Sequence, residues 1–235
     1  MFQLDRTSTV AQLVTTHSAT ARVFQRHGID YCCHGDVTVP AACRDRRLDP
    51  ETLFAELEAT VSGDGPAPDD PRVLSTPALV GRIVERHHGY LRRALPYVAP
   101  IAAKVAAVHG GRDPRLQEVE VVFRELSAAL LPHLDEEETV LFPALMVAHP
   151  DPALVGRELS SMHEDHLAVG DLLALLRLLS DGYATPEWGC NTYRVLMAEL
   201  EALEEDTLRH VHLENHVLAP RFAGALAGDA HPTVS

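Results

Sequence analysis

The chain has 235 residues, of which 46% are hydrophobic and 23% are charged, and its formal net charge is −14. This composition predicts a globular protein with a sizeable core. The acidic excess argues against nucleic acid or an anionic membrane as a partner, since both need clustered Lys and Arg. The sequence shows no signal peptide and no apolar run near the roughly 20 residues that span a bilayer. We therefore expect a cytoplasmic protein with four reduced Cys, and the 14 His point to metal chemistry.

The N-terminal segment 1–62 is predicted to be a small helical domain. Apolar residues at helical spacing predict one helix from Val10 to about Gly28. A second helix is expected to open at Asp49 and Pro50, because an N-cap residue followed by Pro suits the first turn of a helix. The residues between these two helices are predicted to form a loop.

A linker and a bundle of helices are predicted downstream. Segment 63–72 is rich in Pro, Gly and Asp, a composition that disfavours regular structure. Beyond it, runs rich in Leu, Ala and Glu follow four pairs of a capping residue and Pro. These pairs are Thr76-Pro77, Asp113-Pro114, Asp151-Pro152 and Thr185-Pro186. We predict an all-α fold, in which a four-helix bundle at 73–225 follows the small helical N-terminal domain and precedes a C-terminal tail at 226–235.

One motif occurs twice in the predicted bundle, as HLDEEETVLFP from His133 and as HVHLENHVLAP from His210. In both copies a Glu follows the His by four residues, at Glu137 and Glu214, so the two side chains lie one turn apart on one helix face. A Val-Leu pair continues that face and directs the His and Glu towards the interior. Buried polar groups need a partner, and a transition metal ion would provide one.

Two further His complete the predicted site. His88 lies 45 residues before His133, and His166 lies 44 residues before His210, so the bundle reads as two similar helical hairpins. Choosing the neighbouring His residues would break this match by one to three positions. Four His and two Glu suit two iron ions, each with two imidazoles, bridged by both carboxylates and by an oxo or hydroxo group.

Other interpretations of these residues fit the sequence less well than a di-iron site. A single His-x3-Glu is usually a solvated pair on a helix surface, but two copies with matched upstream His favour metal binding. A ferritin-like site needs two Glu-x-x-His motifs, and only Glu85 with His88 fits. One zinc ion would not use so many donors. The nearby acidic residues without a predicted role, assigned to solvated faces, are Glu136, Glu138, Glu204, Glu205 and Asp206.

With these motifs, and with the loop DYCCHG from Asp30 to Gly35, the chain resembles the iron-sulfur cluster repair di-iron proteins, also called repair-of-iron-centres proteins and related to the ScdA group. The resemblance runs from about Asp5 to Arg221. It implies a hemerythrin-like bundle with two iron ions, in a protein induced by nitrosative or oxidative stress. Such a protein helps to restore damaged iron-sulfur proteins, its partners, by supplying iron. The ligands that the resemblance implies are those reached from the spacing: His88, His133, Glu137, His166, His210 and Glu214.

The resemblance also places the paired cysteines of the family at Cys32 and Cys33, for which we expect a redox or metal-transfer role. Adjacent cysteines form only a strained disulfide that is easily reduced. A protonated His34 would lower the pKa of these thiols and raise their reactivity. Two unreactive thiols in a loop are the alternative. The remaining cysteines, Cys43 and Cys190, are expected to be buried apolar residues.

Two other functions stay open. No residue excludes nitric oxide reduction at the two ferrous ions, so the sequence leaves open whether the protein is an enzyme. Reversible oxygen binding of the hemerythrin type is less compatible, because those proteins use a fifth His and a His-x4-Asp ending, whereas Asn215 stands five residues after His210. The sequence does not name an electron donor. The linker allows the N-terminal domain to pack on its own chain or on the partner in a homodimer.

Overall fold

The computed structural model describes residues 3–62 and 70–223 of the chain. Helices and the turns between them make up this part, which contains no strand and a single isolated bridge between Thr9 and Thr38. The predicted all-α class is confirmed. Most of the predicted linker and the whole of the predicted tail lie outside the described residues.

The described chain divides into two compact units. One unit comprises Met1–Leu79 together with Leu208–Arg221, and the other comprises Val80–Thr207 together with Phe222–Ser235. The division falls within the last long helix, which therefore contributes residues to both units.

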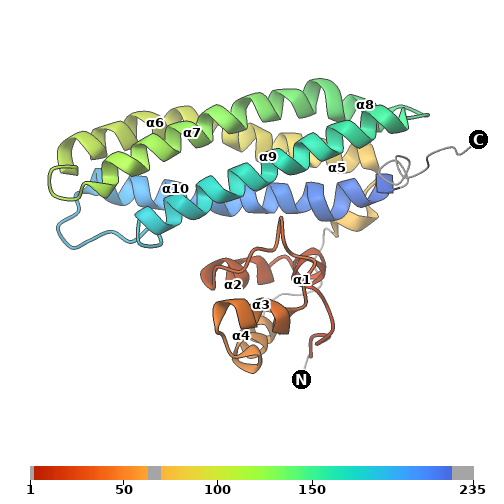
Figure 1. Ribbon diagram of the computed structural model, residues 1–235, viewed down its shortest axis with the longest axis horizontal. Helices are drawn as coiled ribbons and strands as arrows, with labels where there is room; N and C mark the ends of the chain where they lie inside the picture. Colours follow the sequence, from red (N-terminus) through yellow and green to blue (C-terminus); the bar gives the residue numbers. More distant parts are fainter. Residues whose placement is uncertain (1–2, 63–69, 224–235) are drawn as a thin grey trace, which may run out of the picture. The chain divides into compact units, whose positions relative to one another are not determined.

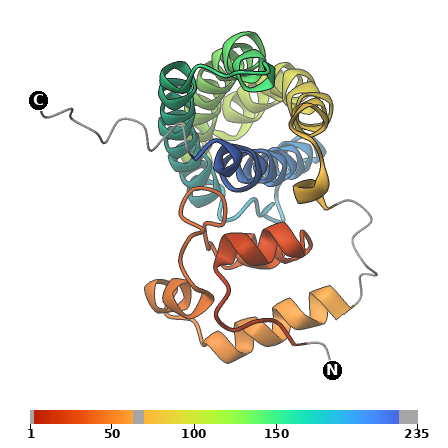
Figure 2. The ribbon, with the colours of Figure 1, turned by 90° about the vertical axis from the view of Figure 1, so that its right-hand side faces the viewer.

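Four short helices form most of the first unit (Figure 2). The predicted single helix from Val10 to Gly28 is wrong, because the chain breaks at His17 and restarts at Thr20, whose hydroxyl donates to the His17 carbonyl over 2.7 Å. The break follows two β-branched residues, Thr15 and Thr16, which are poor helix formers. The third of the four helices was not predicted. The helices are α1 (Val10–Thr16), α2 (Thr20–Arg26), α3 (Val39–Arg46) and α4 (Pro50–Ser62).

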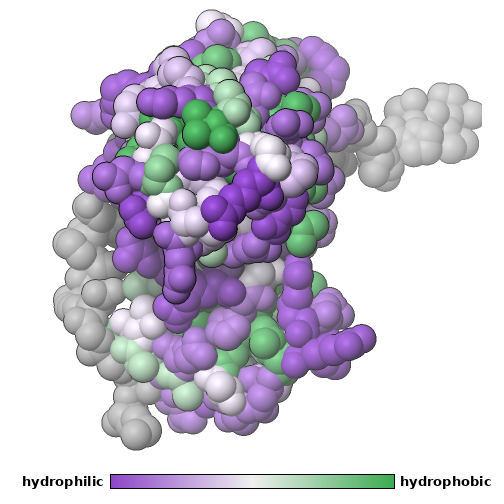
Figure 3. Space-filling model, turned by 90° about the vertical axis from the view of Figure 1, so that its left-hand side faces the viewer, coloured by the Kyte–Doolittle hydropathy of each residue, from purple (hydrophilic) through white to green (hydrophobic). Residues whose placement is uncertain are grey.

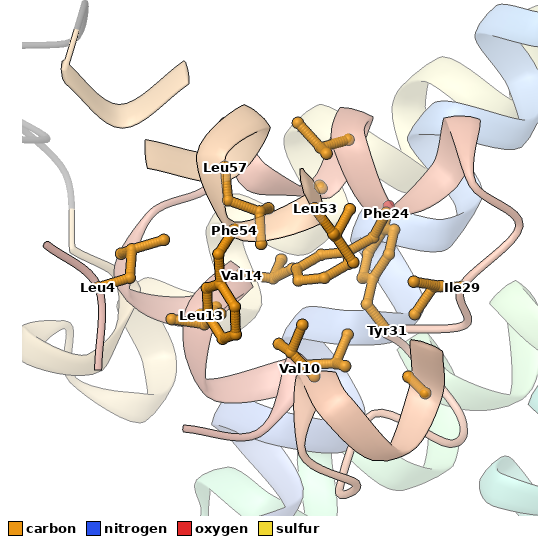
Figure 4. Packing of buried hydrophobic residues seen from close by; sticks show 14 of the residues in the cluster. Leu4, Val10, Leu13, Val14, Phe24, Ile29, Tyr31, Leu53, Phe54 and Leu57 are labelled. Carbon is orange, nitrogen blue, oxygen red and sulfur yellow. The ribbon is translucent and has the colours of Figure 1, made fainter. Parts of the chain in front are cut away.

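Aromatic and aliphatic side chains from these helices share one core (Figure 4). Phe24 and Phe54 are at most 1% exposed, and burying such a side chain stabilises the fold by roughly 1.5–3 kcal/mol. Gly35 closes the loop that leads to α3. A Cβ at this position would lie 2.5 Å from the carbonyl oxygen of Tyr31 and 2.8 Å from the Cβ of Ala11, so only glycine fits.

Four long helical segments make the bundle, and α6, α7 and α9 lie side by side with α10 up to Thr207 (Figure 1). The first segment runs through α5 (Thr76–Ile83), η2 (Val84–His88) and α6 (Gly89–His109). The second runs through α7 (Arg115–Glu136), η3 (Glu137–Leu141) and α8 (Phe142–Met146). The third is α9 (Pro152–Leu179), and the fourth runs through α10 (Asn191–Leu213), η4 (Glu214–Leu218) and η5 (Ala219–Phe222).

Three of the four predicted helix starts agree with the structure within one or two residues, and the fourth is wrong. The helix expected at Thr185-Pro186 begins only at Asn191. The chain makes a turn first, so that Trp188 packs against His109 and Tyr193, with ring centroids 5.7 Å and 5.6 Å apart. Trp188 is half-buried in this turn, and its ring contacts therefore outweigh the local preference for a helix start.

The surface of the described residues is mainly polar. Figure 3 shows one face, on which hydrophilic residues dominate and hydrophobic ones are scattered. The exposed apolar residues include Tyr97, 53% exposed, and Leu178, 72% exposed. Such residues are normal on a protein surface when they are dispersed. Among the described residues, no helix combines the length and the apolar character needed to cross a membrane.

Candidate metal centre

Three of the four bundle segments widen into a π turn at a predicted ligand. The turn η2 ends at His88, whereas η3 begins at Glu137 and η4 begins at Glu214. In η3 and η4 the Glu carbonyl accepts the N–H of the residue five positions later, and a proline follows directly, Pro143 or Pro220. Proline lacks an N–H and crowds the carbonyl four residues back, which favours the wider turn. Such turns occur often at functional sites.

One detail of the predicted buried face is wrong in the first copy of the motif. Val140 was expected to point inwards with Leu141, but Val140 is 39% exposed and Leu141 is 2% exposed. The same π turn follows Glu214, so the exposure of Val140 reflects what packs around the first copy and not the turn itself. In the second copy, Val217 is 5% exposed and Leu218 is fully buried, as expected.

The six predicted ligands are all buried, with exposed fractions of 5% or less. They form two groups in which one ligand atom of each residue lies within 4.8 Å of those of the others. Both Glu belong to both groups, so each carboxylate could bridge two ions. The first group is His88, Glu137, His210 and Glu214, and the second is His133, Glu137, His166 and Glu214.

The two oxygens of Glu137 face different imidazoles. Its Oε1 lies 3.3 Å from His133 Nε2 and 4.0 Å from His166 Nε2, while its Oε2 lies 3.4 Å from His88 Nε2. The Nε2 atoms of His133 and His166 are 3.2 Å apart. This arrangement is the one expected of a carboxylate placed between two cation positions, with two imidazoles converging on one of them.

The other nitrogen of two of these imidazoles meets a carboxylate. His88 Nδ1 lies 2.9 Å from Glu138 Oε1, and His133 Nδ1 lies 3.3 Å from Asp165 Oδ2. Such a bond holds the imidazole in the tautomer whose Nε2 carries a lone pair, as is usual for metal-binding His. Burial by itself would raise the pKa of Glu138, but hydrogen bonds from His88 and Arg92 outweigh it and lower the pKa.

The donor set fits two iron ions. When His88 Nδ1–H donates a hydrogen bond to Glu138, the Nε2 lone pair of His88 faces the Glu137 carboxylate over 3.4 Å. A cation between these two groups stabilises this arrangement. Imidazole nitrogens and carboxylate oxygens, without thiolates, suit iron.

Three acidic residues were wrongly assigned to solvated faces. Glu138 bonds to His88, and Glu204 is 3% exposed and paired with Arg177. Asp206 is half-buried and lies 3.0 Å from Nδ1 of the buried His87. None of these pairs is local in sequence, so helical spacing could not reveal them. Glu136 is exposed as predicted, whereas Glu205 is half-buried.

The loop with the paired cysteines is organised by Asp30. Its Oδ1 accepts the N–H groups of Cys32 and Cys33, each over 2.9 Å, and its Oδ2 lies 2.7 Å from Nδ1 of His34. The two sulfur atoms are 3.5 Å apart and form no disulfide. The expected activation by His34 is wrong for Cys32, because the hydrogen bond with Cys33, burial and the Asp30 charge raise the pKa of the Cys32 thiol.

The two remaining cysteines differ. Cys43 is buried, as predicted, but Cys190 is exposed, which corrects the prediction. Cys190 directly precedes α10, and its Sγ lies 3.2 Å from Nε2 of His109. Hydrogen bonds from His109 and from the backbone of Tyr193 lower the pKa of the Cys190 thiol to about 7.

Within the first unit, residues beside Glu214 hold the cysteine loop. The side chain of Asn215 donates to the Cys32 carbonyl over 2.9 Å, and His216 Nε2 lies 3.0 Å from the same oxygen. His212 Nδ1 lies 3.1 Å from the Tyr31 carbonyl. The turn at Glu214 is thus surrounded by groups that bind backbone carbonyls of the loop.

Known proteins similar to this chain cover almost all of it. A family model described as the hemerythrin HHE cation binding domain matches residues 80–222, and the ScdA_N model, a domain of unknown function, matches residues 6–61. The iron-sulfur cluster repair protein ScdA of Staphylococcus haemolyticus is 33% identical over 223 residues, which are 92% of this chain and 98% of that protein. ScdA of Staphylococcus epidermidis is 31% identical over 89% of this chain and 95% of that protein.

A relative from another genus has the same described function. The iron-sulfur cluster repair protein YtfE of Yersinia pseudotuberculosis is 30% identical over 228 residues, which are 95% of this chain and 99% of that protein. The resemblance indicated by the two motifs and the DYCCHG loop is thereby confirmed. The chain belongs to the family of ScdA and YtfE iron-sulfur cluster repair proteins, with a hemerythrin HHE domain after its ScdA N-terminal domain.

Proposed function

We propose that this protein repairs damaged iron-sulfur clusters by holding two iron ions in its bundle and supplying iron to the damaged protein. The observation that carries the proposal is the pair of His and Glu groups that share Glu137 and Glu214. The names of the relatives, which describe repair proteins, support the same function. The ligands would be the six residues of those two groups.

The roles of the surrounding residues follow from the geometry. Glu138 and Asp165 would hold His88 and His133 in the orientation that presents Nε2 to iron. Burial of the donors would exclude bulk water and keep the carboxylates from competing partners. Bound iron would supply exchangeable ferrous ion and redox chemistry. Because protons compete with metal for imidazole, we expect iron to be released more readily as the pH falls.

We propose that the predicted bundle at 73–225 holds the iron, whereas segment 1–62 carries the paired cysteines. Cys32 and Cys33 in the second of these would take part in redox chemistry or metal transfer. We also propose a cytoplasmic location, a separate electron donor and damaged iron-sulfur proteins as partners. A homodimer stays a prediction that size-exclusion chromatography with light scattering would check.

Repair can be tested with an oxidatively inactivated iron-sulfur enzyme. We expect the iron-loaded protein to restore its activity, and an equal amount of free ferrous ion to restore less under the same conditions. The variant His133→Ala should lose most of this effect, whereas His163→Ala, at an exposed position on α9, should keep it. Equal restoration by free iron and by the loaded protein would contradict the proposal.

Neither alternative function is favoured by the names of the relatives. Nitric oxide reduction would be revived by single-turnover formation of nitrous oxide that is lost in Glu137→Ala. Oxygen binding would be revived by a reversible, oxygen-induced absorption spectrum of the diferrous protein.

A further inference from the structure

A second set of metal-binding groups lies in the cysteine loop of the first unit. Ligand atoms of Asp30, Cys32 and Cys33 all lie within 4.8 Å of one another. We propose that these three residues form a separate cation site, which takes one divalent ion of intermediate softness such as Fe²⁺ or Zn²⁺. Two thiolates and one carboxylate are the donors that such ions accept.

The spacing of the donors suits a tetrahedral ion. Metal–sulfur and metal–oxygen bonds of about 2.3 Å and 2.1 Å give donor separations of roughly 3.6–3.8 Å around a tetrahedral ion. The two sulfur atoms lie 3.5 Å apart, and Cys32 Sγ lies 3.3 Å from Asp30 Oδ1. The ion therefore needs only small side-chain shifts.

The loop is held in this conformation before any ion binds. The Asp30 carboxylate accepts both cysteine N–H groups, which places the two side chains on the same side of the loop. The Cys32 carbonyl is bonded to Asn215 and lies within hydrogen-bond distance of His216. Groups already held in place lose less conformational entropy when they bind.

The proposed site is open to solvent on one side. Cys32 is 2% exposed, whereas Cys33 is half-buried and Asp30 also lies at intermediate exposure. An ion bound by these three residues would keep its fourth position towards Cys33 and the solvent. That position could hold water or a donor from another protein, as required of a site that passes an ion on.

A disulfide is the competing fate of the two thiols. Adjacent cysteines form a disulfide only with distorted geometry, and the sulfur atoms would have to approach from 3.5 Å to about 2.05 Å. Metal binding makes no such demand. In the binding step, two thiol protons leave to solvent, two metal–sulfur bonds and one metal–oxygen bond form, and no group is oxidised or reduced.

Anaerobic titration of the reduced full-length protein with Co²⁺ tests the site. Cobalt bound by thiolates gives an intense charge-transfer band that His and carboxylate ligands do not give. We expect the intensity of this band to correspond to one thiolate-bound cobalt per chain, besides any cobalt held in the bundle, and the band to disappear in Cys32→Ser and in Cys33→Ser. Asp30→Asn, which keeps the acceptor for the backbone N–H groups, should weaken binding at least tenfold.

Matched controls separate this site from the rest of the chain. Cys43→Ser and Cys190→Ser should leave the band unchanged, and circular dichroism should show that every variant is folded. The proposal is overturned if the folded wild type gives no thiolate band, or if the band survives in both Cys32→Ser and Cys33→Ser. The site does not rest on the proposed repair function, since the band should persist in His133→Ala even where repair activity is lost.

Discussion

The two His-x3-Glu turns share a backbone conformation but have different surroundings. Both enter a π turn at the Glu. Around the first turn, Glu136 is exposed, and the side chain of Asp165, which contacts His133, is 47% exposed. Around the second turn, His212 is 3% exposed and Asn215 binds the Cys32 carbonyl.

The comparison separates what the motif does to the backbone from what surrounds each turn. The repeated spacing of His, Glu and Pro produces the same turn twice, because those residues act on the backbone within a few positions. Apart from the Val-Leu pair, the residues between them differ, and they help to decide what each turn contacts. The first turn is supported by acidic groups that reach solvent, and the second is tied to the cysteine loop of its own unit.

The strongest test asks whether the two turns hold metal equally. We expect wild-type protein to carry two iron ions per chain, and His133→Ala and His210→Ala each to carry one or none, because each loses an imidazole from one group. Metal analysis and the oxo-to-iron absorption band measure this. His163→Ala serves as the control. Retention of two iron ions in either variant, or full occupancy by zinc in the wild type, would contradict the prediction that both turns supply iron ligands.

The next test concerns pH and the second turn. Burial lowers the pKa of His212 to about 4, although its contact with the Tyr31 carbonyl opposes this shift. Between pH 6.5 and 4 the unfolded chain therefore binds more protons at this residue than the folded one. The free energy of unfolding should fall as the pH drops through this range, by about 3 kcal/mol in all.

Urea unfolding of wild type and His212→Gln across this range isolates the effect, because both proteins share the other titrating groups. We expect a shallower dependence on pH in the variant. His163→Gln, changed at an exposed position, should follow the wild type. If the free energy of unfolding depends equally on pH in wild type and in His212→Gln, then His212 does not contribute to that dependence.

The first turn can be weakened without removing a ligand. Glu138→Gln and Asp165→Asn take the charge from the groups that contact His88 and His133. We expect each variant to lose roughly 10–100-fold in iron affinity, as measured by competition with a chelator. Glu136→Gln, at an exposed position, is the matched control. Unchanged affinity in both variants would show that these carboxylates do not support the ligands.

The smallest effect is expected where the second turn holds the loop. Asn215→Ala removes the hydrogen bond to the Cys32 carbonyl and should cost about 1 kcal/mol of stability. Cys32 should then react faster with an alkylating reagent. Cys190 is the internal reference, because its pKa of about 7 gives it a large thiolate fraction at neutral pH in both proteins. A parallel change at both cysteines would indicate general unfolding instead.

Much of this protein could be predicted from local sequence patterns. Helical periodicity gave the all-α class, the Asp-Pro pairs marked the starts of α7 and α9, and the i, i+4 spacing paired each His with its Glu. The similar offsets of His88 and His166, 45 and 44 residues, then favoured them over neighbouring His residues, and the structure brings both close to Glu137. These inferences succeed because residues within one or two turns of a helix share a face whatever the rest of the chain does.

Tertiary packing decided the rest. The contacts of Glu138 with His88 and of Asp165 with His133 join residues on different helices, so they depend on how the helices pack. The exposure of Cys190 follows from the turn in which Trp188 packs. The sequence by itself determined which side chains share a helix face, because that depends on the backbone period alone. Only the tertiary structure determined which faces meet and which groups orient the imidazoles, because those contacts join residues distant in the chain.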